Sequence, residues 1–287
     1  MAERPRRTFL YLAVGVFAIS WAAPLIRLCE APPLAIATYR MGFSALLLLP
    51  LALKDCVREL KPRSVLTLFL PGAFLGLHFA LWVSSLSYTS VASSVILVTT
   101  NPIFVGVLSF FLLRERMTRP LLLGTALAIA GGITVGVGDF REGEGLLLGN
   151  GLALAGALMM SCYLVAGRSL RQRASLLSYV FVVYGAAALF LLLLSLLLGE
   201  ALRGFPLTTW VLFLLLALVP TLLGHSTINW AVRYLSTPVV ALAIVGEPVL
   251  ASLLAYLVLG ESLTWPRVVG GAVILAGVYL GIFRRRG

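Results

Sequence analysis

Four ionisable side chains fall inside long apolar stretches of this chain and are its first candidates for chemistry: Arg40, His78, His225 and Glu247. Ionisable groups in mid-membrane cost about 2.5–3.5 kcal/mol on insertion scales, so they are rare and mark functional sites or buried pairs. A carboxylate there could take up a proton or bind an amine, and a guanidinium could bind a carboxylate. The structural alternative is that Arg40 and Glu247 pair and hold two helices together.

Glu247 and Asn101 occupy equivalent positions in two similar stretches, and each is followed by a proline. Both lie about eleven residues into an apolar run, roughly 16 Å deep at the rise of an α-helix, and so near the membrane midplane. Proline frees the backbone carbonyl one turn earlier and bends a helix, and bent helices line binding sites in membrane carriers. The sequence therefore predicts kinks at Pro102, at Pro248 and, on the first span, at Pro24. Asn101 has the alternative role of a hydrogen bond between helices.

Arg40 and His78 are predicted at a similar depth, about 10 Å below the outer surface by helical rise. Trp82 follows His78 by four residues, so the two lie on one face of a helix. A cation, an imidazole and an indole at one depth could bind the carboxylate and the ring of an amino acid, and Tyr39 joins this set beside Arg40. The alternatives are an anchoring role for Arg40 and a place in the interfacial aromatic belt for Trp82.

His225 and Asn229 repeat the spacing of four in the second half of the chain. We expect them near the cytoplasmic end of their helix, and their alignment with His78 and Trp82 needs a slip of one residue. Tyr163 is a further candidate for the cavity wall, although aromatic residues on spans more often face lipid or core.

The composition identifies the elements that must position these residues. The chain is 60% hydrophobic, its mean hydropathy is +1.03, and only 11% of its residues are charged. A soluble domain would have about 25% charged residues, so we predict an all-α integral membrane protein. Spans need about 20 apolar residues each. Ten such stretches are found, roughly at 8–28, 33–53, 64–86, 90–113, 119–138, 146–167, 176–198, 207–230, 236–259 and 264–283.

The basic residues predict the orientation of these spans. With both termini cytoplasmic, seventeen of the 22 Lys and Arg lie on the inner side and four on the outer side, as the positive-inside rule requires. The net charge of +11 is therefore a topology signal that spreads over several loops, and nucleic-acid binding is not expected. The first apolar stretch is read as an uncleaved helix. We predict a multi-pass protein of the inner (plasma) membrane.

The second half of the chain repeats the first at an offset of 146 residues. The repeat aligns scarce residues: Leu113-x-Glu115 with Leu259-x-Glu261, and Thr118-x-Pro120 with Thr264-x-Pro266. It divides the chain into a first repeat (1–138), a linker (139–145) and a second repeat (146–287). Because each repeat holds five spans, the two must be inverted in the membrane, which is typical of alternating-access carriers with a central cavity.

Small residues recur at every fourth position of the fifth and tenth spans and favour close helix packing, either between the repeats or between two protomers. Whether the protein is a monomer or a homodimer stays open. Motifs for other functions are missing from the sequence. It contains no Walker lysine loop, no His-Glu-x-x-His and no Gly-x-Ser-x-Gly, so neither direct ATP coupling nor a known hydrolase chemistry is indicated. No cofactor or metal is expected.

Taken together, the doubled Pro-and-Glu motif and the ten spans resemble the EamA family of the drug/metabolite transporter superfamily. The two copies run from Asn101-Pro102 through Glu115 to Thr118, and from Glu247-Pro248 through Glu261 to Thr264. Tyr39-Arg40 is also similar to that family's basic position on the second span.

The resemblance implies inverted repeats around a central cavity and the export of amino acids or other small metabolites, with aromatic and neutral amino acids favoured here. It also suggests that Glu115 and Glu261 are structural, with hydrogen bonds that close the turn into the next span. Two alternatives remain: a carrier of another class, such as a multidrug carrier, and a membrane enzyme or subunit without transport.

Overall fold

The computed structural model describes residues 3–59, 62–89, 91–137, 146–260 and 264–283, and within these ranges every regular element is a helix. The predicted linker at 139–145 and the motif residue Glu261 lie outside the described residues. In chain order the elements are α1 (Glu3–Ser20), α2 (Ala22–Arg27), α3 (Pro33–Glu59), α4 (Pro62–Ser85), α5 (Val91–Val98), α6 (Asn101–Leu108), the π-helix η1 (Ser109–Leu113), α7 (Arg119–Val137), α8 (Leu146–Arg171), α9 (Leu176–Leu197), α10 (Leu207–Leu216), the π-helix η2 (Ala217–His225), α11 (Ser226–Tyr234), α12 (Thr237–Ile244), α13 (Glu247–Leu259) and α14 (Trp265–Phe283).

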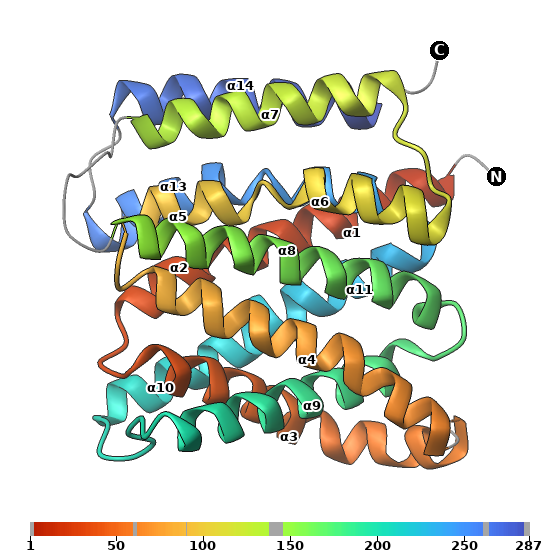
Figure 1. Ribbon diagram of the computed structural model, residues 1–287, viewed down its shortest axis with the longest axis vertical. Helices are drawn as coiled ribbons and strands as arrows, with labels where there is room; N and C mark the ends of the chain where they lie inside the picture. The colour runs from red at the N-terminus through yellow and green to blue at the C-terminus, as the bar shows by residue number, and fades with distance from the viewer. Residues whose placement is uncertain (1–2, 60–61, 90, 138–145, 261–263, 284–287) are drawn as a thin grey trace.

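Nine helices or helix runs among the described residues are long and apolar enough to cross a membrane. They agree with nine of the ten expected spans. The remaining one, α7, has an apolar stretch of residues 119–135, which is shorter than the others. α1 begins and α14 ends at the same end of the bundle (Figure 1). The described part of the chain is therefore all-helical, with nine clear candidates for membrane spans.

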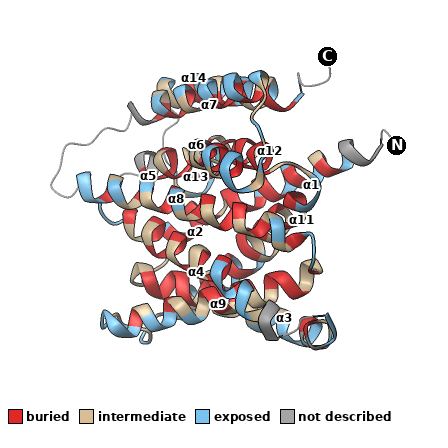
Figure 2. Cartoon of the chain, turned by 45° about the vertical axis from the view of Figure 1, so that its right-hand side comes forward, coloured by how far each residue is buried: buried red, intermediate tan, exposed pale blue. Residues whose placement is uncertain are grey.

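Two layers of unequal size make up the bundle. α7 and α14 pack along each other at one edge, apart from the other helices in both views (Figures 1 and 2). A small apolar cluster joins this pair to α5 and α12 and includes Ile96, Ala128, Leu242 and Ile274. The larger core fills the rest of the bundle, where Figure 2 shows most of the buried residues.

Proline breaks explain why several spans consist of more than one helix. Pro102 and Pro248 are the second residues of α6 and α13, and Pro24 lies in the short α2, so kinks occur near all three predicted positions. Proline is compatible with the first turn of a helix but removes the N–H that would continue the preceding one. Each break therefore begins a new helix inside a span.

The two broken spans also end in the same way. Arg114 after η1 and Gly260 after α13, at the offset of 146, both have left-handed backbone, with φ of 57° and 70°. Glycine adopts this conformation without steric cost, whereas a residue with a Cβ is strained there.

Candidate functional site

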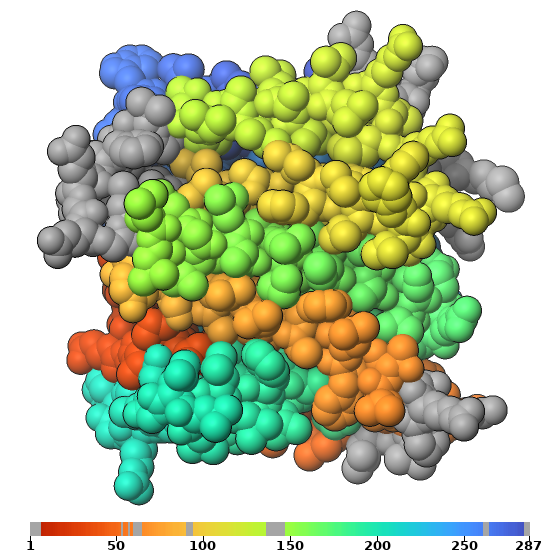
Figure 3. Space-filling view, viewed as in Figure 1, coloured from red at the N-terminus to blue at the C-terminus, as the bar shows by residue number. Residues whose placement is uncertain are grey.

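A small cavity lies in the middle of the bundle, and the outer helices cover it on the face shown in Figure 3. Its volume is about 30 Å³. This is room for water but far below the roughly 300 Å³ of a typical ligand pocket, so a metabolite needs a wider conformation. Ten helices and the turn at Thr99 contribute to the wall. The lining residues are Ile19, Ala22, Arg40, His78, Trp82, Val98, Thr99, Asn101, Met160, His225, Ile244 and Glu247.

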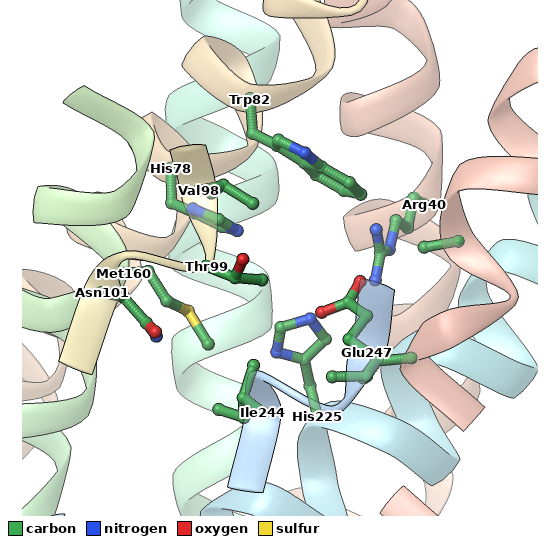
Figure 4. Close-up of a pocket in the computed structure, with 12 residues that line it drawn as sticks. Arg40, His78, Trp82, Val98, Thr99, Asn101, Met160, His225, Ile244 and Glu247 are labelled. Atoms are coloured by element: carbon green, nitrogen blue, oxygen red, sulfur yellow. The ribbon is translucent and has the colours of Figure 1, made fainter. Parts of the chain in front are cut away.

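The structure brings six of the nine predicted binding residues to this one cavity. In the view of Figure 4, Arg40 and Glu247 lie on one side with their charged groups toward each other, and Asn101 lies on the opposite side. Trp82 closes the top and His225 the bottom. Residues from both halves of the chain thus form one chamber.

A proline fixes the position of Arg40. Pro220, inside η2, cannot donate to the carbonyl of Leu216, and the hydroxyl of Thr221 donates to that carbonyl instead, at 2.9 Å. The same hydroxyl oxygen accepts a hydrogen bond of 2.7 Å from Arg40 Nε. The guanidinium also lies 4.2 Å from the centre of the Phe79 ring, within cation–π range. One edge of Arg40 is therefore held, and its two terminal nitrogens are left for other partners.

His78 and Trp82 form the predicted stripe on α4. Their rings are nearly parallel, with centroids 6.0 Å apart, and His78 Nδ1 lies 2.9 Å from the carbonyl oxygen of Gly156 on α8. This hydrogen bond fixes the imidazole plane and keeps both rings against the cavity. Phe79, between them in sequence, contacts His225 edge to face at 5.4 Å and so connects the two halves of the chain.

His225 lies deeper than the sequence predicted. It was expected near the cytoplasmic end of its span, but the run from Leu207 continues to Tyr234, and His225 lines the same cavity as His78. The π-helix η2 supplies the reason, because its wider turns take up an extra residue. The slip of one residue in the alignment of the two histidines has the same explanation.

Buried polar atoms without a hydrogen-bond partner surround the cavity. Eleven such atoms are found among the described residues, and five of them belong to residues that line the cavity: both terminal nitrogens of Arg40, Nε1 of Trp82, Oδ1 of Asn101 and Nδ1 of His225. Each such group costs about 1–3 kcal/mol, and native proteins leave few of them. Their gathering around one cavity is the signature of a binding site, because a polar ligand would satisfy them together.

The other three predicted binding residues lie elsewhere. Tyr39 donates to the carbonyl of Leu202 and packs among aromatic rings, stacked on Phe213 at 5.0 Å. Tyr163 on α8 donates to Asn229 Oδ1 on α11 at 2.7 Å, and both side chains are buried. All three hydrogen-bond within the protein, and none of them lines the cavity.

Sequence reasoning missed half of the cavity wall. Val98 and Ile244 are equivalent at the offset of 146, one turn before the two prolines, so the repeat itself was a signal that could have identified them. Thr99 is adjacent to Val98. Ile19, Ala22 and Met160 are ordinary apolar residues whose place on the wall only the packing reveals.

Glu115 does not close its own turn, contrary to the sequence-based interpretation. Its carboxylate accepts from Arg168 Nε on α8 and from the backbone N–H of Thr237 at the start of α12, both at 2.9 Å. Arg168 in turn donates to the carbonyls of Val232 and Arg233 at the end of α11. The left-handed turn at Arg114 redirects the chain toward these helices. One carboxylate thus ties the first half of the chain to the second.

Glu115→Ala is therefore expected to lower stability by about 1–3 kcal/mol, because Arg168 and the first turn of α12 each lose a partly buried partner. Glu115→Gln should lose less, since an amide oxygen can still accept from Thr237. Thermal unfolding of the purified protein measures the effect, with Arg116→Ala as the control at an exposed neighbouring position. An unfolding temperature equal to that of the control would show that this tie is dispensable.

Similarity to known proteins shows the family to which this chain belongs. The EamA-like transporter family matches residues 7–137 and again residues 147–283. The chain belongs to this family and is a multi-pass membrane transporter.

Three relatives that are named as transporters or as an efflux pump align with most of this chain. An uncharacterized transporter of Archaeoglobus fulgidus is 27% identical over 86% of this chain and 86% of its own length. The uncharacterized transporter YdfC of Bacillus subtilis is 25% identical over 93% of this chain and 87% of its own. A probable amino-acid metabolite efflux pump of Salmonella typhimurium is 28% identical over 95% and 93%. A crystal structure with 17% identity matches over 98% of this chain and 99% of its own, with a TM-score of 0.80, which shows the fold.

Proposed function

We propose that this protein is a secondary transporter that exports small amphipathic metabolites, with aromatic or neutral amino acids as the favoured substrates. The observation that carries the proposal is the set of buried, unpartnered polar atoms around one central cavity. The efflux pump of Salmonella typhimurium supports the substrate class by its name.

We propose that transport occurs by alternating access between two inverted repeats of five spans, residues 1–138 and 146–287. The two separate family matches, the equivalent helix breaks and the common end of α1 and α14 support this arrangement. The cavity has to widen from its present volume to accept substrate, and such a change is inherent in alternating access. The distribution of Lys and Arg supports an inner-membrane protein with both termini in the cytoplasm.

The side chains on the cavity wall suggest how a substrate would be bound. The free edge of Arg40 has the two parallel donors that a carboxylate accepts in a bidentate pair. The rings of His78 and Trp82 offer a stacking surface for an aromatic side chain, and Met160 and Ile244 complete an apolar pocket. Carboxylate recognition by Arg40 is thus the central contact of the proposal.

Flux of labelled amino acids in proteoliposomes tests the proposal. We expect saturable exchange of phenylalanine or leucine that is absent from liposomes without protein. Lack of saturable flux for every amino acid would reject the substrate class. Stabilisation of the purified protein by a panel of drugs or other metabolites instead would favour the alternative carrier classes.

Glu247 is the candidate for proton coupling, because its carboxylate lines the cavity and no hydrogen bond to it is found in the described part of the chain. If it carries the coupling proton, Glu247→Gln should remove the pH dependence of net export while substrate exchange continues. Export and exchange are measured in parallel across a pH series. Unchanged pH dependence in the variant would exclude this role.

A further inference from the structure

The two helix breaks free backbone carbonyls on residues that line the cavity. Pro102 and Pro248 have no N–H, so the carbonyls of Val98 and Ile244, four residues earlier, lose their usual helical donors. Val98 is the last residue of α5 and Ile244 the last residue of α12, and both line the cavity.

The hydrogen bonds around the breaks follow the same pattern in both halves. Thr100 N–H donates to the carbonyl of Leu97 at 3.2 Å, and Gly246 N–H donates to that of Ala243 at 3.1 Å. These bonds tighten the last turn and satisfy the carbonyl just before the one that the proline leaves without its helical donor. The carbonyl ends of α5 and α12 also carry the negative partial charge of their helices. On its carbonyl side, each break therefore carries negative partial charge.

Two side chains add acceptors at the same breaks. Asn101 is the first residue of α6, only 1% exposed, and its Oδ1 has no hydrogen-bond partner. Glu247 is the first residue of α13 and faces the cavity. Each break thus supplies one freed carbonyl and one side-chain oxygen within four residues of sequence, and Figure 4 shows Asn101 and Glu247 on opposite sides of the chamber.

We infer that the paired helix breaks form a cation subsite in the cavity, and that it binds the ammonium group of a zwitterionic ligand. Arg40 and Glu247 face each other, so the two formal charges of the cavity balance when Glu247 is ionised. An inorganic cation would add an unbalanced charge, whereas a zwitterion brings its own carboxylate for Arg40. Unwound carbonyls and helix carbonyl ends are suited to cationic groups. The inference rests on the proposed transport function and assigns the amine its partners.

The experiment compares phenylalanine with 3-phenylpropionate, which has the same ring and carboxylate but no amine. Affinity is measured from the rise in unfolding temperature of the purified protein with ligand concentration. We expect the wild type to bind phenylalanine at least about ten-fold more tightly, and each lost acceptor to reduce this ratio. Because the ratio is taken within each variant, a general loss of stability does not affect it.

Two variants remove acceptors in different ways. Pro248→Ala supplies an N–H that competes for the Ile244 carbonyl, and Asn101→Leu removes the amide oxygen; each should lower the ratio below that of the wild type. Asn101→Asp keeps an acceptor and should retain the preference for the amine. Pro50→Ala, at an exposed proline inside α3 away from the cavity, is the matched control and should leave the ratio unchanged. If Pro248→Ala does not fold, the Asn101 pair carries the test.

Equal affinity of the wild type for the two ligands would overturn the subsite, and so would an unchanged ratio in Asn101→Leu. Stabilisation by NaCl, but not by phenylalanine at equal ionic strength, would also overturn the assignment to an ammonium group. These results leave the proposed function intact if labelled amino acids still show saturable flux. Failure of flux for every amino acid rejects the proposed function itself.

Discussion

Arg40→Leu is expected to reduce saturable amino acid flux at least about 100-fold, because a bidentate, desolvated charge pair with the substrate carboxylate is lost. The guanidinium is 1% exposed, its Nε is held by Thr221, and its two terminal nitrogens have no protein hydrogen-bond partner. No other described side chain on the cavity wall carries a positive charge at every pH. The substrate carboxylate would therefore enter the chamber without a counter-charge.

Arg40→Lys separates charge from geometry. An ammonium group keeps the positive charge but has no second parallel donor and no planar face for Phe79, so we expect a ten-fold or greater loss of apparent affinity. Arg203→Leu, on an exposed loop, is the control for a general change in charge. Flux is normalised to folded protein measured by gel filtration. Wild-type affinity in Arg40→Leu would show that the carboxylate binds elsewhere and that Arg40 is only a strut.

Much of the cavity was predictable because its residues violate the apolar pattern around them. Arg40, His78, Asn101 and Glu247 stand out in spans where polarity is costly, and proline after the last two indicates the breaks. Because burying a polar group in the membrane costs free energy, such residues can be recognised as candidates from the sequence alone. Apolar wall residues such as Met160 carry no cost and therefore give no signal.

Two predictions about the site residues, the position of Tyr39 and the depth of His225, differ from the structure for local reasons. Tyr39 was assigned with its neighbour Arg40, but consecutive helical residues point about 100° apart, and Tyr39 turns into an aromatic cluster with Trp210 and Phe213. The depth of His225 was wrong because an α-helical rise was assumed across a π-helix. Both errors concern direction and rise along a helix, which the residue types alone do not encode.

Glu115 shows a different limit of prediction from sequence. The repeated motif predicted a structural role for it, but its partners Arg168 and Thr237 lie 53 and 122 residues further along the chain. Repeats reveal that a residue has a role in each half, and only the packing of the halves reveals which atoms it contacts.

Gly277→Leu is expected to destabilise the protein by about 3 kcal/mol or more, since a bulky residue would be forced between two backbones. A Cβ at Gly277 would lie 2.6 Å from both the backbone N of Ala128 and the carbonyl oxygen of Gly124. Gly131 and Gly270 make the same kind of contact further along the pair, so α7 and α14 would have to separate over much of their length. Gly277→Ala should already cost about 1–3 kcal/mol.

Gly185→Ala on α9 is the matched control, because a Cβ there meets nothing within 4 Å. It should leave the unfolding temperature unchanged or raise it, as alanine favours a helix over glycine by about 1 kcal/mol. The α7–α14 pair contributes no residue to the cavity wall, so Gly277→Ala should lower thermal stability while flux per folded molecule stays at the wild-type value. If flux falls and stability does not, then α7 and α14 slide on each other during transport, and the pair is a moving part rather than a scaffold.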